Sequence, residues 1–584
     1  MKPLLEQLLT DAVGQLKEQG VVPADVQPAI AVTRTRDASH GDFASNLAMV
    51  LSKPAGMKPR DLSEKIVAAL PASDRLDKVE IAGPGFINFY MVSDELSAVV
   101  GSILSAGEQF GRSDAGKGQK IQIEFISANP TGPLHVGHGR GAAMGASISN
   151  LLAAAGYDVQ REYYVNDAGR QMDILATSIW LRYLGQHNVT FDFPVNGYKG
   201  EYIHDIARGL TDLVGDEAVR SAATVFDGVS PDEPAGGNKE AHIDDLIQRA
   251  RQLLGETGYR QVFDLGLNTI LDDIRQDMSE FDVHFDVWFS ERSLTEDVQA
   301  VIAQLKTSGH LYEKEGAWWF ASTEFGDEKD RVVVRENGQS TYFASDLAYL
   351  RNKMERGFEK VLYVFGADHH GYVGRMLAAC DALGYDRDRI EFLLIQFANL
   401  FSAGERQQMS TRSGEFITIR QLRDEVGKDA ARYFYVMRRY QQHLEFDLDL
   451  ARSQSKDNPV YYVQYAHARI CSVERQVRDR SLTIDTEAGL QNLGRLTEPH
   501  ESAVMTLLST YPDIVLRAAN AREPHQITTY LQELANALNK YYEAHKWLVD
   551  DAELRNARLC LILASRQVIK NGLQLINVSA PEVL

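Results

Sequence analysis

The sequence predicts an α/β protein: a central domain with a parallel, doubly wound sheet lies between a smaller α/β domain and a C-terminal all-α helical bundle. From about residue 119, apolar strand-like runs alternate with helical segments, as in parallel sheets covered by helices. Before residue 115, a short strand unit lies among amphipathic helical stretches. Beyond about residue 451, strand patterns fade and helical periodicity dominates, which is typical of a bundle.

Length and composition agree with several domains in one soluble globular chain. The 584 residues are 44% hydrophobic and 24% charged, which is ordinary for folded domains with large cores. We place the domains at 1–115, 116–450 and 451–584. The more polar stretch at about 186–280 is predicted to be an insertion in the central domain, with the loop 230–238 between two helical segments.

Targeting and cysteine signals are weak. The leucine stripe of residues 4–9 is broken by polar residues, so it predicts an amphipathic helix and not a signal peptide. The apolar run 559–564 is too short to span a bilayer, and we expect a cytoplasmic protein without a membrane partner. The widely spaced Cys380, Cys471 and Cys560 disfavour a disulfide framework or a cysteine zinc site and predict buried thiols.

The charge distribution bears on nucleic-acid binding. A formal net charge of −20 argues against it, because phosphate backbones repel acidic surfaces. However, residues 451–584 hold 15 Lys+Arg and 15 Asp+Glu, so the acidic excess lies upstream. The C-terminal part is therefore the region whose charge best permits RNA binding, although a solvated helical surface has the same balance.

Local patterns place the individual elements. Short strands are expected within 79–90, and a loose glycine-rich connection at 111–118. The predicted strands of the central domain include 121–126, 158–165 and 361–365. Helices are expected from about Gly137, from about Ile419 and over 530–542.

The most informative motif is His135-Val-Gly-His138, which lies between a predicted strand and a predicted helix. A helix N-terminus presents unpaired N–H groups and a positive dipole end, so phosphates are stabilised there. Two imidazoles add donors where pyrophosphate charge develops, and Gly137 leaves room for a base or ribose. Taken alone, the pair is equally consistent with an ordinary helix start.

A second candidate segment follows the strand at 361–365, where ligands bind in open α/β sheets. Gly366 permits close approach of a ligand, and Asp368 is placed to meet ribose hydroxyls. His369 and His370 are adjacent, so their side chains diverge, which disfavours a metal site.

A third segment, the polar loop 408–414, precedes the helix expected near Ile419. It is either a mobile surface turn or a loop that closes over phosphates. In the second case Arg412 supplies positive charge and Ser410 a hydrogen bond.

Two of these motifs, His135–His138 and Met409-Ser-Thr-Arg412, resemble the signatures of class I aminoacyl-tRNA synthetases. The flanking segments narrow the resemblance to the arginyl-tRNA synthetase family, and they extend it over essentially the whole chain. These segments are 41–46, 83–88, 124–129, 342–346, 457–469 and 578–583.

The resemblance implies an N-terminal domain that touches the tRNA elbow, a Rossmann catalytic domain and a C-terminal domain that reads the anticodon. It also implies that the carboxylate of L-arginine attacks the α-phosphate of ATP, pyrophosphate leaves, and arginine passes to the 2′-hydroxyl of the terminal adenosine of tRNA(Arg). ATP with Mg²⁺ is expected, without zinc or an organic prosthetic group. We further expect a monomer in which arginine activation requires tRNA.

The resemblance also assigns site residues. His135, His138, Ser410 and Arg412 are the expected catalytic groups. The expected ATP-binding residues are His135, Gly137, His138, Gly366, Asp368 and Met409. The expected arginine-binding residues are Glu124, Ser127, Asn129, Tyr342, Asp346 and His370.

The arginine assignment has a physical basis, since a guanidinium is told from an ammonium by carboxylates that pair with its planar fork. Glu124 and Asp346 are suitable carboxylates. Strand alternation puts Glu124 on the same face as Gln122, which also suits solvent exposure. Asp346 is also explained as an ordinary carboxylate in the first turn of a helix.

Two positions depart from the family pattern. The second signature usually opens with a lysine and carries another inside, but here Gln408 and Thr411 occupy those places. No compensating lysine lies just upstream of His135. Arg412 is our first choice for the cation on the pyrophosphate, and Arg406 and Arg140 are the alternatives, with magnesium sharing the charge.

Three other functions remain open. A small nucleotidyltransferase needs neither the long helical C-terminus nor the loop at 409–412. A different class I synthetase is a second possibility, but those for Ile, Val or Leu carry a large editing insertion and the one for cysteine has thiolate zinc ligands, and neither feature is evident. A catalytically silent tRNA-binding paralogue is consistent with the missing lysines. In the C-terminal part, the aromatic stretch 461–469 offers rings for stacking on RNA bases, although such a stripe is more often core.

Overall fold

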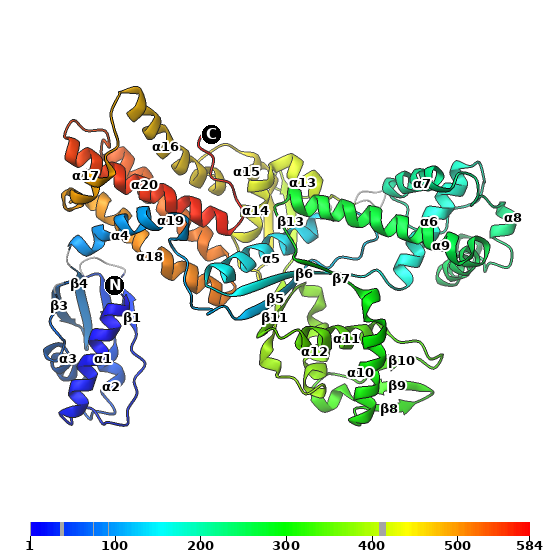
Figure 1. The fold of residues 1–584 in the computed structure, drawn as a ribbon, viewed down its shortest axis with the longest axis horizontal. Coiled ribbons are helices and arrows are strands. Elements are labelled where there is room, and N and C mark those ends of the chain that lie inside the picture. Colours follow the sequence, from blue (N-terminus) through cyan, green and yellow to red (C-terminus); the bar gives the residue numbers. More distant parts are fainter. Residues whose placement is uncertain (1, 36–39, 74, 92, 408–415) are drawn as a thin grey trace.

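The computed structural model describes residues 2–35, 40–73, 75–91, 93–407 and 416–584. The chain forms an elongated molecule in which a central sheet domain joins an N-terminal domain, a helical lobe and a C-terminal bundle (Figure 1). The predicted loop residues Met409, Ser410 and Arg412 lie outside the described ranges.

The N-terminal domain has its own core. A four-stranded antiparallel sheet runs in the order β1-β2-β4-β3 and packs against three helices. The leucine stripe of α1 is buried, as expected for an amphipathic helix. The elements are α1 Lys2–Glu18, β1 Val32–Arg34, β2 Phe43–Ser45, α2 Leu47–Leu51, α3 Pro59–Ala68, β3 Leu76–Ala82 and β4 Phe86–Met91.

The linker helix α4 (Ser93–Ala106) leaves this domain and packs on the C-terminal bundle (Figure 1). After it, the amide of Asn571 donates to the carbonyls of Gly107 and Phe110, at 2.9 and 3.2 Å. The route from the first domain to the sheet is thus held by helices from the other end of the chain.

The central sheet has five parallel strands in the order β12-β11-β5-β6-β7. Strand order reverses beside β5, because the chain moves from β5 to β6 on one side and returns to β11 on the other. Such a switch point opens a crevice at the carboxyl ends of the strands. The strands are β5 Lys120–Phe125, β6 Asp158–Val165, β7 Val287–Ser290, β11 Lys360–Gly366 and β12 Ile390–Ile395.

Helices cover the sheet, and α5 (Val136–Ala154) follows β5 directly, as the motif at 135–138 predicts. Gly145 lets α5 approach the sheet closely, since a Cβ there would lie 2.3 Å from the Phe125 ring. A small antiparallel sheet, β10-β9-β8, packs beside α11. These elements are α10 Thr295–Thr307, β8 Leu311–Lys314, β9 Ala317–Phe320, β10 Arg331–Val334, α11 Tyr342–Glu355 and α12 His370–Ala382.

A lobe of helices projects from the sheet domain between β6 and β7 (Figure 1). The long helix α9 bends at Gly255, whose φ of 69° is left-handed, a conformation that glycine adopts without steric cost. The lobe comprises α6 Arg170–Gln186, α7 Glu201–Val214, α8 Ala222–Val225 and α9 Lys239–Glu280.

The chain then passes through a second small sheet, β14-β13-β15, into the bundle. These transition elements are β13 Ala398–Ser402, β14 Glu405–Arg406, α13 Ile419–Val426, α14 Lys428–Val436, β15 Leu444–Asp447 and α15 Leu448–Arg452. The bundle consists of α16 Pro459–Asp479, α17 Thr486–Gln491, α18 Pro499–Ala521, α19 His525–Ala544 and α20 Ala552–Leu575. No helix of the described ranges is long and apolar enough to cross a bilayer, and all three cysteines are buried and free, as expected.

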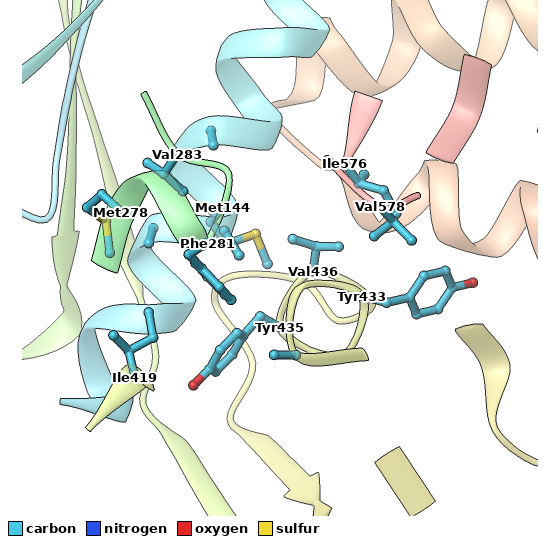
Figure 2. Close-up of a cluster of buried hydrophobic side chains, with 14 of the residues drawn as sticks. Met144, Met278, Phe281, Val283, Ile419, Tyr433, Tyr435, Val436, Ile576 and Val578 are labelled. Carbon is cyan, nitrogen blue, oxygen red and sulfur yellow. The ribbon is translucent and has the colours of Figure 1, made fainter. Parts of the chain in front are cut away.

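Helix α14 is the junction of these parts. Figure 2 shows its aromatic residues packed between α5, the end of α9 and the C-terminal tail. Tyr435 donates to the carbonyl of Val136 at 2.9 Å, and Tyr433 donates to the carbonyl of Thr528 in α19 at 3.2 Å. The start of α5 and the bundle therefore share one supporting helix.

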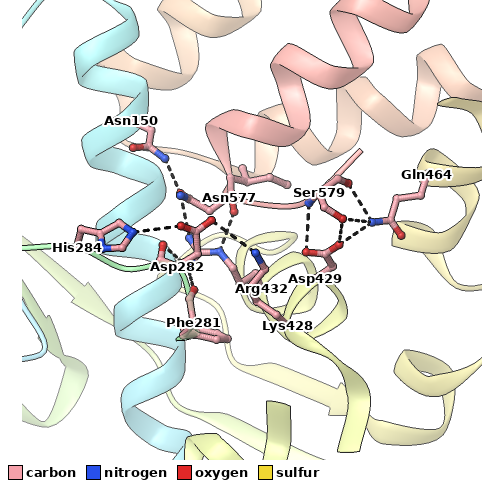
Figure 3. Close-up of polar contacts among 11 residues, drawn as sticks. Asn150, Phe281, Asp282, His284, Lys428, Asp429, Arg432, Gln464, Asn577 and Ser579 are labelled. Atoms are coloured by element: carbon pink, nitrogen blue, oxygen red, sulfur yellow. Dashed lines mark hydrogen bonds and ion pairs between the residues drawn. The ribbon is translucent and has the colours of Figure 1, made fainter. Parts of the chain in front are cut away.

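Arg432 of α14 is fully buried in the same junction (Figure 3). Its guanidinium donates to the carbonyls of Ile576 and Phe281 at 3.0 and 2.7 Å, and to Asn577 Oδ1 at 3.2 Å. Burial lowers the pKa of Arg432 to about 10, so the group remains charged at neutral pH. The three nitrogen atoms of one guanidinium thus tie the C-terminal tail and the end of the lobe to α14.

We expect Arg432→Met to lower the free energy of unfolding by about 2–5 kcal/mol, because several buried carbonyls lose their donors at roughly 1–3 kcal/mol each. Urea unfolding followed by tryptophan fluorescence measures the loss. Arg452→Met is the matched control, since Arg452 makes half-exposed ion pairs worth about 0–1 kcal/mol. Equal unfolding midpoints for the two variants would contradict this role of Arg432.

Candidate active site

A cavity of about 460 Å³ opens at the switch point of the sheet. Its walls come from the carboxyl ends of β5, β6, β11 and β12, from the start of α5 and from the first turns of α11. Among the predicted site residues, those that line it are Glu124, Ser127, Asn129, His135, Gly137, His138, Asp346, Gly366 and Asp368. Residues separated by more than 200 positions are therefore brought to one place.

The two signature histidines cap α5. Nδ1 of His135 accepts from the backbone N–H of Gly137 at 3.0 Å, and Nδ1 of His138 accepts from the backbone N–H of His135 at 3.3 Å. Their rings stack with centroids 3.7 Å apart. Gly139 lies one residue further, where a Cβ would lie 2.8 Å from the Tyr435 ring, so α5 is pressed against α14.

This capping determines the protonation of both rings. Burial lowers the pKa of His138 to about 3, with His135 contributing, and burial also lowers the pKa of His135. Both imidazoles are thus neutral at pH 7. Because each Nδ1 accepts a backbone hydrogen, the proton of each ring is on Nε2. The helix start therefore offers two Nε2–H donors without a cationic ring.

Glu124 lies on the pocket floor and is only 3% exposed. The expectation that its strand face suits solvent is wrong, because α11 covers this face of the sheet with Lys353, whose Nζ lies 2.5 Å from Glu124 Oε2. Ser127 Oγ donates to Glu124 Oε1 at 2.9 Å and accepts from the backbone N–H of Tyr164 at 3.1 Å. The carboxylate is thereby fixed at both oxygens.

The backbone after β5 is strained. Ile126 and Ser127 have φ of 69° and 43°, which is left-handed backbone for two consecutive residues other than glycine. A β-branched residue in this region is a genuine outlier, and such strain costs on the order of 1–3 kcal/mol per residue. The strain turns the chain so that Ser127 reaches back to Glu124.

Asp346 lies in the first turns of α11 and faces the same cavity. Burial raises its pKa to about 7, and the charge of Glu124 adds to the rise. The hydroxyl of Tyr372 and the guanidinium of Arg375 favour the ionised form, so they oppose this rise in pKa. Asp346 is therefore a carboxylate that lacks a full counter-charge in the protein.

The other predicted residues vary in their placement. The amide of Asn129 donates to Gln171 Oε1 at 2.7 Å at the cavity rim. Tyr342 is 57% exposed, and it is not among the lining residues. His370 is exposed and outside the lining as well, whereas its neighbour His369 lines the cavity.

The structure overturns one alternative for the pyrophosphate cation. Arg140 is 1% exposed, and its guanidinium donates to the carbonyls of Gln396 and Gln442 at 2.7 Å and of Arg439 at 2.9 Å. It cannot reach a ligand, because its donors hold the loop after β12 to α5. Arg406 is exposed on β14. Among the described residues that line the cavity, none is Lys or Arg.

Sequence reasoning missed Glu291, which directly follows β7. It is 7% exposed, and its Oε2 has no hydrogen-bond partner among the described residues. Burial raises its pKa to about 7, and the charges of Asp346 and Asp167 add to the rise. Its position at the carboxyl end of a sheet strand is the signal that could have identified it. No cluster of three His, Cys, Asp or Glu side chains suited to a metal occurs in the described ranges.

Comparisons with known proteins decide the family. Residues 99–444 match the catalytic domain of class I (R) tRNA synthetases, residues 3–91 match the arginyl tRNA synthetase N-terminal domain, and residues 463–584 match the DALR anticodon binding domain. An arginine–tRNA ligase of Thioalkalivibrio sulfidiphilus is 58% identical over the full length of both chains. The chain belongs to the arginyl-tRNA synthetase family.

Other members of this family agree in length and fold. The arginine–tRNA ligase of Hydrogenovibrio crunogenus is 55% identical over the whole of both chains. The Thermus thermophilus arginyl-tRNA synthetase structure has a TM-score of 0.74 at 22% identity, again covering both chains fully. At that identity the likeness shows the shared class I fold, with its parallel sheet and two appended domains.

The raised pKa of Asp346 predicts a pH-dependent cost of folding. A carboxyl group whose folded-state pKa exceeds its ordinary value destabilises the fold once pH rises above that ordinary value, and the cost is complete above about pH 7. We therefore expect Asp346→Asn to unfold at a higher temperature than the wild type at pH 8, with the difference vanishing toward pH 4. Differential scanning calorimetry across this range measures it.

The matched control is Asp368→Asn, which removes an exposed carboxylate from the same cavity. It should leave the pH dependence of the melting temperature unchanged. A melting temperature of Asp346→Asn that follows the wild type at every pH would contradict the burial of this charge.

Proposed function

We propose that the chain activates L-arginine with ATP and transfers it to the 2′-hydroxyl of the terminal adenosine of tRNA(Arg). The observation that carries this proposal is the convergence, in one cavity, of the capped histidine pair with Glu124 and Asp346. The named relatives are arginine–tRNA ligases, and class I synthetases use ATP. We expect the protein to act as a monomer in the cytoplasm.

In the first step, a carboxylate oxygen of arginine attacks the α-phosphate of ATP and pyrophosphate leaves. His135 and His138 donate from Nε2 to the phosphate oxygens as charge develops there, which preorganised donors stabilise strongly. Gly137 and Gly366 leave room for the nucleotide, and Asp368 accepts from a ribose hydroxyl. Positioning of the two substrates provides most of the remaining rate.

Neutralisation of the triphosphate requires charge from outside the described cavity lining, which lacks Lys and Arg. Mg²⁺ enters with ATP as part of the substrate and supplies some of it. We assign the rest to Arg412, with Ser410 and Met409 in the same loop. The loop runs into α13, whose first residues lie against the signature motif through a bridge between His135 and Thr418.

Arginine is held at both ends. Glu124, with Ser127 and Asn129, receives the α-ammonium end, and Asp346 pairs with the guanidinium. We add Glu291 as a second carboxylate for the guanidinium. It does not line the cavity, but it is buried, its charge couples to that of Asp346, and it keeps one oxygen free among the described residues. Two carboxylates suit a planar fork and leave the point charge of lysine poorly satisfied. Tyr342 and His370 stay in the proposal as arginine contacts, although neither lines the cavity in the empty protein.

The C-terminal bundle offers a surface for RNA. Arg469 lies between the rings of Tyr465 and Tyr542, at 4.6 and 4.4 Å from their centroids, and both rings are about 40% exposed. By contrast His467, from the same stretch, is buried and bonded to the carbonyl of Pro581. An exposed stack of aromatic rings and a guanidinium suits unpaired bases. We propose this patch as a contact for the tRNA.

The function is tested by ATP–pyrophosphate exchange with each amino acid, with and without total bacterial tRNA. Among the amino acids, we expect exchange only with arginine, and only when tRNA is present. Exchange with another amino acid would overturn the assignment of the carboxylates. Absence of exchange under every condition would favour a tRNA-binding paralogue without activity. Asp346→Asn should reduce exchange with arginine by orders of magnitude.

The neutral His138 predicts a specific pattern of substitutions. His138→Ala should reduce the rate of arginine activation about 10²- to 10³-fold, as loss of a preorganised donor does. His138→Gln should lose about tenfold, because the amide nitrogen of glutamine reaches the position of Nε2. Both variants lose the capping contact of Nδ1, so the difference between them isolates the Nε2–H donor. Equal rates for the two would refute its role.

A further inference from the structure

Lys353, the cation behind Glu124, contacts neither ATP nor arginine in the proposed reaction. Lys353 is fully buried and does not line the cavity. Its Nζ lies 2.5 Å from Glu124 Oε2, between the rings of Tyr349 and Tyr363, at 4.2 and 3.9 Å from their centroids. The ammonium is thus enclosed by one carboxylate and two aromatic faces, both of which favour a cation.

The pairing is built into the register of sheet and helix. Glu124 of β5 lies beside Glu162 of β6 and beside Tyr363 of β11 in the strand register. On α11, Tyr349, Lys353 and Arg356 share one face by their spacing. Lys353 meets Glu124, while Arg356 meets Glu162 Oε2 at 2.5 Å and Tyr349 donates to Glu162 Oε1 at 2.6 Å. Two strand carboxylates are thus matched by two helix cations.

The two pairs differ in what they face. Glu162 is fully buried and does not line the cavity, so its pair with Arg356 is structural. Glu124 lines the cavity, with Oε1 accepting from Ser127 and Oε2 from Lys353. Each carboxylate oxygen has a second lone pair. The lone pairs left over are the ones that a bound ammonium group can use.

We propose that Lys353 is a positioning residue for arginine recognition: it supplies the counter-charge of the buried Glu124 and fixes its carboxylate, so that the free lone pairs accept hydrogen bonds from the α-ammonium of arginine. The inference rests on the proposed function, in which arginine occupies this cavity. A carboxylate buried to this degree without a counter-charge becomes neutral. A neutral carboxyl group loses the charge-assisted part of its bonds to an ammonium.

Several other charged or titratable groups surround Glu124, and a test must separate their effects. From α11, α12 and strands β6 and β11 these are Asp346, Tyr349, Lys353, Arg356, Tyr372, Glu162, Tyr164 and Tyr363. Asp346 titrates near pH 7, and it would change the affinity for any guanidinium ligand. Comparison of two ligands that share the guanidinium but differ at the α-amino group cancels that contribution.

Isothermal titration calorimetry with L-arginine and with 5-guanidinopentanoic acid, which lacks the α-amino group, makes this comparison. We expect the full-length wild type to prefer arginine by about 10- to 100-fold, as hydrogen bonds to charged groups allow. In Lys353→Met the preference should fall toward unity, because Glu124 loses its counter-charge and one of the two contacts that orient it. Lys353→Arg should keep most of it.

Arg356→Met is the matched control on the same face of α11. It should lower the unfolding midpoint, as Lys353→Met does, and retain the wild-type preference for arginine. The inference fails if Lys353→Met keeps the wild-type preference, including the case in which it weakens both ligands equally, or if Lys353→Arg loses the preference as fully as Lys353→Met does. A wild type that binds both ligands equally overturns the inference but leaves arginine recognition standing. A wild type that binds neither overturns the proposed function as well.

Discussion

The buried guanidinium of Arg432 is the interaction on which the assembly of the molecule depends. A charge inside a protein is tolerated when hydrogen bonds replace its hydration, and here backbone carbonyls from the end of α9 and from the C-terminal tail do so. Burial lowers the pKa of Arg432 to about 10, while the charges of Asp282 and Asp429 oppose this fall, so the group stays charged. Asp429, one turn away on α14, accepts separately from Ser579 and Gln464 (Figure 3). Because these groups come from the lobe, the tail and the bundle, none of the three can shift without breaking bonds of α14.

The same helix supports the active site, which has a consequence for tRNA binding. Tyr435 holds the carbonyl of Val136 inside the signature motif, and Tyr433 holds α19 of the bundle. A ligand that moves the bundle therefore acts on α14, the helix that supports α5 and its histidine pair. Such a coupling requires that the ligand bind the two arrangements with different affinity. An arginine activation that depends on tRNA is thus consistent with how α14 is packed, and exchange assays with and without tRNA bear on it directly.

Local patterns in the sequence were sufficient for the framework of the site. The strand at 158–165, the helix after His135 and the strand that ends at Gly366 follow from periodicity and from turn residues, which depend on near neighbours alone. What the sequence could not indicate depends on contacts between distant segments. Strand alternation predicted that Glu124 could face solvent. Only the position of α11 brings Lys353 over it, and the two residues are 229 positions apart. The sequence also allowed Arg140 as a phosphate ligand. In the structure its guanidinium donates to three carbonyls of the 396–442 region, so it is not available to a ligand. The left-handed backbone at Ile126 and Ser127 could not be predicted either, because neither residue is a glycine.

The three carboxylates of the proposed arginine site differ in their counter-charges, and this difference bears on specificity. Glu124 already has a cationic partner in the protein, Lys353, which holds its carboxylate in place. Asp346 and Glu291 lack a full counter-charge, and burial raises both pKa values to about 7. Their ionised forms destabilise the empty protein, and a guanidinium that pairs with them relieves this cost on binding. A lysine side chain brings a single point charge, which cannot satisfy two carboxylates in one plane. Under the proposed function, relief of this folding cost on binding favours arginine over lysine.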